Sequence, residues 1–132
     1  MIGLDTNILL RLLLQDDETH SKKALALVDS LTPAEPGFIN SAVLLELIWT
    51  ARRQARMSRE ELKQILGGLL DSDNLVLEDE NVIELALDEM ERNEEEFADI
   101  FIALQNRELG CRTTLTFDKR AATRVPGMEL LA

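Results

Sequence analysis

The sequence predicts an α/β protein, a three-layer α/β/α sandwich around a short and mostly parallel β-sheet. Short apolar segments alternate with amphipathic segments of helical length, which is the pattern of βα units. The apolar segments do not alternate with polar residues, so we expect strands that are covered on both faces. The three prolines and most of the six glycines fall between these segments, where turns belong. With 132 residues, the chain is expected to form a single domain over residues 1–132.

The first half of the chain is expected to hold two strands and three helices. An amphipathic period places Ala24, Leu27 and Val28 on one side of the second helix. Asn40 or Ser41 is a suitable N-cap for the third. The expected elements are a strand at residues 1–4, a helix at 6–14, a break at 15–17, a helix at 18–31, a strand at 38–39 and a helix from 41 to about 54.

The second half continues the same alternation. Ser58 followed by Glu61 predicts a capping box at the start of a helix, and Gly110 is placed to end another. The expected elements are a helix from 58 to about 70, a strand at 75–77, helices at 81–91 and 97–109, and strands at 112–116 and 128–131.

The net charge of −11 argues at first against a nucleic-acid partner. The charge is uneven, however: residues 78–99 hold 11 acidic residues and one basic residue, and the rest of the chain is nearly balanced. Carboxylates can also face a polyanion when metal ions neutralise them. The negative net charge therefore does not exclude a local surface that binds nucleic acid.

The chain carries no sign of export or membrane insertion. It begins with a polar cluster and without a basic segment, so we expect no signal peptide. Its apolar runs are too short to span a bilayer, and its single cysteine, Cys111, cannot form an internal disulfide. We expect a cytoplasmic protein with no membrane partner.

Three acidic residues are predicted to lie at one edge of the sheet. Asp5 and Asp118 follow predicted strands, and ligands gather beyond the C-terminal ends of parallel strands. Asp99 falls in the first turn of its helix, which tends to face the same edge.

Glu46 is the fourth candidate, and its sequence surroundings are unusual. Its helical neighbours include Ala42, Val43 and Trp49. A charged carboxylate on so apolar a face costs several kcal/mol unless it is paired. Glu46 is therefore expected to be partly buried and to serve a site.

Each acid also has an ordinary structural explanation. Asp5 and Asp118 could cap the helices that follow them, and Asp99 suits the helix dipole. Glu46 could pair with Arg52 or Arg53. Four carboxylates at one edge favour a metal site over these separate explanations. Carboxylates about 5 Å apart repel by about 3 kcal/mol per pair, and a fold tolerates this when a metal ion or bound protons offset the charge.

The residue types present restrict the chemistry. His20 lies in a polar stretch and is interpreted as a surface histidine, and Cys111 is interpreted as a small core residue. There is no glycine-rich phosphate loop and no nucleophile elbow. Oxygen ligands alone favour Mg²⁺ or Mn²⁺ over zinc, and such ions chiefly serve phosphoryl chemistry.

Four segments in order resemble the PIN-domain ribonucleases, most closely toxins of the VapC type. They begin Leu-Asp-Thr-Asn at Leu4, Leu-Glu-Leu-Ile-Trp at Leu45, Phe-Ala-Asp-Ile at Phe97, and Thr-Leu-Thr-Phe-Asp at Thr114, the last followed by Val-Pro-Gly-Met at Val125. Together they extend over nearly the whole chain.

The resemblance implies a metal-dependent endoribonuclease. It places the family's catalytic and metal-binding acids on Asp5, Glu46, Asp99 and Asp118, with one or two Mg²⁺ or Mn²⁺ ions bound mainly by Asp5 and Asp99. It further implies in-line attack of a metal-bound water on the RNA phosphodiester, which leaves 5′-phosphate and 3′-hydroxyl ends. As a toxin, the protein would have a cognate antitoxin whose basic side chain enters the acidic site.

Several other residues have weaker assignments. Thr116 matches a hydroxyl position that precedes Asp118 in the family. Asn7 could orient Asp5, or it could simply cap the first helix. The acidic run 94–96 is either a solvated turn or a source of one more carboxylate at the rim of the active site. RNA- or partner-binding residues are predicted in a basic cluster that could equally be a solvated helix end: Arg52, Arg53, Arg56 and Arg59.

Alternative functions stay open at this stage. One is a housekeeping RNA-processing nuclease of the same fold without an antitoxin. Another is a phosphatase or phosphotransfer domain that uses Asp5, although Asn7 occupies the place where such a loop has a second Asp. A third is a non-catalytic interaction module, which would leave the four acids unexplained. Leucines in residues 9–14 make us expect a homodimer.

Overall fold

The computed structural model describes residues 1–14 and 16–131. The chain divides into two compact units, an N-terminal unit (Met1–Glu78) and a C-terminal unit (Asp79–Ala132). Each unit contains helices and a short parallel sheet, so the predicted α/β class is confirmed. Within the described residues, none of the helices combines the length and apolar character needed to cross a membrane.

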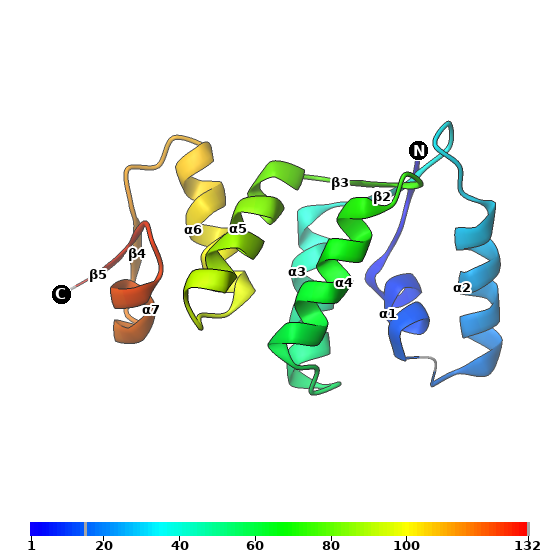
Figure 1. Cartoon of the computed structure of the whole chain (residues 1–132), viewed down its shortest axis with the longest axis horizontal. Coiled ribbons are helices and arrows are strands. Elements are labelled where there is room, and N and C mark those ends of the chain that lie inside the picture. The colour runs from blue at the N-terminus through cyan, green and yellow to red at the C-terminus, as the bar shows by residue number, and fades with distance from the viewer. Residues whose placement is uncertain (15, 132) are drawn as a thin grey trace. The chain divides into compact units, whose positions relative to one another are not determined.

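The N-terminal unit contains a three-stranded parallel sheet with β2 in the middle (Figure 1). Its elements are β1 (Ile2–Gly3), α1 (Thr6–Leu14), α2 (Glu18–Ser30), β2 (Gly37–Ile39), α3 (Ser41–Arg53), α4 (Arg59–Asp71) and β3 (Leu75–Leu77). Residue 15 of the predicted break at 15–17 lies outside the described residues.

The helix starts of this unit confirm the capping predictions. The side chain of Asn40 accepts a hydrogen bond from Val43 N at 2.8 Å at the start of α3. Ser58 and Glu61 form the predicted capping box of α4. Such caps satisfy amide groups that have no partner inside the helix. They fix where each helix begins relative to the strand or turn before it.

Leucine and isoleucine side chains fill the core of the N-terminal unit. Ile39 on β2 and Leu44 and Leu47 on α3 are at most 2% exposed. Gly37 at the start of β2 is tightly surrounded, because a Cβ there would lie 2.8 Å from Leu4 Cδ1 and 3.0 Å from methyl carbons of Leu31 and Leu75. The parallel pairing of β2 with β1 and β3 brings the C-terminal ends of these three strands to one edge of the sheet.

The C-terminal unit pairs two helices and adds a small βαβ unit. Its elements are α5 (Glu80–Arg92), α6 (Phe97–Glu108), β4 (Thr114–Thr116), α7 (Lys119–Arg124) and β5 (Met128–Leu130). Strands β4 and β5 are parallel, and α7 connects them. Phe97 and Phe101 of α6 are fully buried and stack with ring centroids 5.6 Å apart. Helix α6, which carries both rings, packs on α5 (Figure 1).

Two expectations need correction. The five strands form two sheets rather than one, because β4 and β5 pair only with each other among the described strands. Cys111 is exposed and does not belong to the core. It follows Gly110, whose φ of +99° ends α6 and turns the chain outward before β4. His20 is exposed as predicted, and its Nδ1 lies 2.7 Å from Asp17 Oδ2.

Candidate metal centre and active site

Polar oxygens follow every strand of the N-terminal sheet. Asp5 comes two residues after β1 and is exposed, and its carbonyl accepts a hydrogen bond from Ile8 N at the start of α1. Asn40 directly follows β2, and Glu78 directly follows β3. Because the strands are parallel, these residues share one edge of the sheet. This is the edge at which α/β proteins bind ligands.

Glu78 was not identified from the sequence, although it follows a correctly predicted strand. Its Oε1 accepts a hydrogen bond from Ser41 N at 2.8 Å, at the first residue of α3. The carboxylate therefore connects the end of β3 to the start of the helix that carries Glu46. Its position directly after residues 75–77 was the available signal.

Glu46 is exposed on α3, so the expectation that it is partly buried is wrong. The helix buries Leu44, Leu47, Ile48 and Ala51. Ala42 and Trp49 lie on the exposed side with Glu46, and Trp49 is 53% exposed. Apolar neighbours therefore did not mean a buried face. Solvation of Glu46 removes the burial cost that singled it out, and its assignment depends on the family resemblance.

The C-terminal unit brings two of the predicted acids together. Asp99 lies in the first turn of α6, and Asp118 follows β4 and caps α7. Burial raises the pKa of Asp99 above its ordinary value, and the negative charges of Asp118, Glu95 and Glu96 raise it further. The two carboxyl groups are therefore within electrostatic range of each other.

Asp118 is held in place by two hydrogen bonds. Its backbone N–H donates to Thr116 Oγ1 at 3.0 Å, and its Oδ1 accepts from Ala121 N at 3.0 Å. Thr116 therefore orients the backbone of the fourth acid. Capping of α7 is therefore a structural role for Asp118, but the cap hydrogen bond uses only its Oδ1 atom.

The raised pKa of Asp99 predicts how a substitution changes stability. The folded chain holds this proton more tightly than the unfolded chain does. Stability therefore falls as pH rises through the interval between the ordinary pKa and the raised one, and stays lower above it. We expect Asp99→Asn to raise Tm by about 2 °C near pH 7 in EDTA, a gain that shrinks as pH is lowered through that interval. Thermal melts of both proteins against pH measure this; a lower Tm for Asp99→Asn near pH 7 would contradict it.

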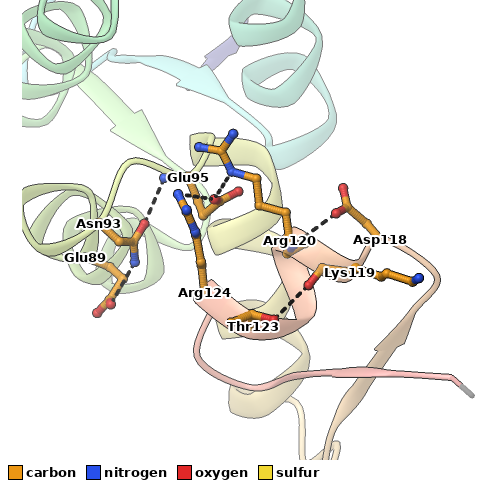
Figure 2. A network of polar contacts seen from close by, with 9 residues as sticks. Glu89, Asn93, Glu95, Asp118, Lys119, Arg120, Thr123 and Arg124 are labelled. Atoms are coloured by element: carbon orange, nitrogen blue, oxygen red, sulfur yellow. Dashed lines mark hydrogen bonds and ion pairs between the residues drawn. The ribbon is translucent and has the colours of Figure 1, made fainter.

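A buried carboxylate lies next to this pair of acids. The Glu95 side chain is 8% exposed and accepts from Arg120 Nε at 2.8 Å, while Arg124 Nη1 lies 3.8 Å away (Figure 2). Its backbone N–H donates to Asn93 Oδ1 at 3.0 Å. Glu95 is therefore not part of a solvated turn. The ion pairs connect the segment before α6, the helix that carries Asp99, to α7, whose N-cap is Asp118.

The remaining candidates have mixed surroundings. Asn7 makes no hydrogen bond with Asp5 within the described part of the chain, so an orienting role stays a prediction. It lines a cavity of about 470 Å³ between α1 and α2.

The arginine cluster separates into structural and exposed members. Arg52 Nη1 donates to Met57 O at 2.6 Å, which stabilises the turn between α3 and α4. Arg59 is half-buried, whereas Arg53 and Arg56 are exposed.

Carboxylate oxygens are the ligand type that a hard divalent cation prefers. Asp99 and Asp118 repel each other, and a cation shared between them would relieve that repulsion. Among residues 1–14 and 16–131, no three histidine, cysteine or acidic side chains form a group that could hold a metal ion. The structure brings together Asp99 and Asp118, while Asp5 and Glu46 belong to the other unit.

Acids that follow the C-terminal ends of parallel strands lie where α/β proteins bind ligands, and divalent metals held by such acids serve phosphodiester hydrolysis. The sequence matches the PIN domain over residues 2–127, and the chain belongs to this family. Its short parallel sheets and many helices are consistent with the three-layer α/β/α fold of PIN domains. Membership supports a nuclease, and PIN nucleases act on RNA. A comparison with curated proteins gives no match.

Proposed function

We propose that this protein is a metal-dependent endoribonuclease and the VapC-type toxin of a toxin–antitoxin pair. The observation that carries the proposal is the match to the PIN family over residues 2–127, and two acids within electrostatic range of each other, Asp99 and Asp118, support it. We further propose that residues 1–132 act as one nuclease domain, since the family match runs through both compact units.

Four carboxylates would hold Mg²⁺ or Mn²⁺ in this proposal. Asp5 and Asp99 are the main ligands, with Glu46 and Asp118 binding directly or through water. When bound, the metal supplies an activated water and offsets negative charge on the phosphate. Asp118 presents Oδ2 while Oδ1 is held by the Ala121 amide. Thr116 keeps the backbone of Asp118 in place for this task.

The antitoxin and the homodimer are also proposals. Asp99, Asp118 and Glu96 give this region negative charge, which a lysine or arginine of an antitoxin segment would complement. Leu14 of α1 is 37% exposed, and its neighbours Leu12 and Leu13 are partly exposed. Apolar side chains at a helix surface suit contact with a second copy.

The purified protein without antitoxin should cleave RNA in Mg²⁺ or Mn²⁺ and stop when EDTA removes the metal. Gel analysis of a broad panel of structured RNAs checks this, and sequencing of the product ends should find 5′-phosphates. If all RNAs of this panel stay intact in both metals, the nuclease proposal is contradicted. Cleavage combined with unchanged growth upon induction in cells would favour an RNA-processing role over the toxin.

A further inference from the structure

Arg120 is a positive side chain among the acids of the C-terminal unit. It lies on α7, two residues after Asp118, and its side chain is 59% exposed. Figure 2 shows the Arg120 guanidinium turned toward Glu95, and Asp118 is the N-cap of the same helix. This places a cation beside carboxylates that would otherwise repel a phosphate.

Glu95 fixes the direction of the Arg120 guanidinium. The 2.8 Å hydrogen bond uses only Nε, and its acceptor is buried and held by the turn at Asn93. The two terminal nitrogens of Arg120 make no hydrogen bond with any residue that the structure describes. Arg120 thus keeps unused donors two residues after the acid that caps α7.

Arg124 provides a natural comparison on the same helix. It approaches the same carboxylate, but at 3.8 Å and from one turn further along α7. Both arginines therefore offset the buried charge of Glu95. Only Arg120 combines a fixed guanidinium with a position next to the acid at the start of α7.

We propose that Arg120 binds a phosphate of the RNA backbone at or next to the bond that is cut, with Glu95 as its positioning residue. A planar guanidinium with two free nitrogens matches the geometry of phosphate oxygens and can form two parallel hydrogen bonds. Donors directed at a phosphate also stabilise the charge that develops on it during cleavage. This inference rests on the proposed nuclease function and adds the substrate contact that the acidic residues lack.

The test compares Arg120→Gln with Arg124→Gln and Arg120→Lys, on a short single-stranded RNA that the wild type cleaves. We expect Arg120→Gln to lower kcat/KM by about 10- to 100-fold. The kcat/KM of Arg124→Gln should stay within about threefold of the wild type. The kcat/KM of Arg120→Lys should lie between those of Arg120→Gln and the wild type, because lysine keeps the charge but lacks the two parallel donors of the guanidinium. The dependence of kcat/KM on salt should also become shallower in Arg120→Gln, by about 0.7 in the log–log slope, as expected for one lost phosphate contact.

Thermal melts separate this role from a structural one, because both glutamine variants remove a partner of Glu95. An Arg120→Gln variant that keeps wild-type kcat/KM and salt slope, in a protein that does cleave RNA, would overturn this inference and leave the nuclease proposal standing. Equal losses in Arg124→Gln and Arg120→Gln would likewise overturn it. A wild type without cleavage overturns both proposals.

Discussion

Asp99→Asn should lower RNA cleavage on the order of a thousandfold or more, the equivalent of about 4 kcal/mol in the barrier. The substitution keeps the size of the side chain and removes the charge that would bind the metal. Asp5→Asn should have a comparable effect, although Asp5 and Asp99 belong to different compact units. Single-turnover cleavage assays in Mg²⁺ and Mn²⁺ measure both losses.

Matched controls separate a lost ligand from lost negative charge. Asp29→Asn alters an exposed acid of the N-terminal unit, and Glu108→Gln alters one at the end of α6. Both variants should cleave at wild-type rates. The four-acid site would be contradicted if Asp5→Asn cleaved like Asp29→Asn while Asp99→Asn was inactive.

Phe101→Ala should lower the free energy of unfolding by about 3–5 kcal/mol. The ring is fully buried and stacks on Phe97 at a centroid distance of 5.6 Å, so its removal leaves a cavity in the core. Such a loss is a large part of the roughly 5–15 kcal/mol that stabilises most domains. Because α6 also carries Asp99, cleavage should fall together with Tm.

Ile102→Ala is the control on the same helix, since Ile102 is 39% exposed. Its cost should stay below about 1 kcal/mol. Chemical denaturation of the three proteins, monitored by circular dichroism, gives both values. Equal destabilisation by the two substitutions would show that α6 does not bury the face that contains Phe101.

The sequence predicted most helices and strands because local signals mark their ends. The capping box at Ser58, the N-cap at Asn40 and the glycine after α6 act within a few residues, so the sequence alone shows them. The division of the strands into two sheets depends instead on pairing between distant segments. The exposure of Glu46 was missed for a similar reason, because the side of α3 that packs is decided by the whole core.

The candidate site divides in the same way. Positions directly after predicted strands identified Asp5 and Asp118, and the same reasoning would have identified Glu78. The burial of Glu95 could not be predicted, because a run of three glutamates is usually solvated and its arginine partners lie more than twenty residues later. The convergence of all four acids stays a prediction.

The most direct test of the central claim is a calorimetric titration of Asp5→Asn with Mn²⁺, compared with the wild type. If Asp5 and Asp99 bind the same metal, Asp5→Asn should lose Mn²⁺ binding as completely as Asp99→Asn does, while Asp29→Asn binds normally. Wild-type Mn²⁺ affinity in Asp5→Asn would contradict a metal centre shared by the four acids.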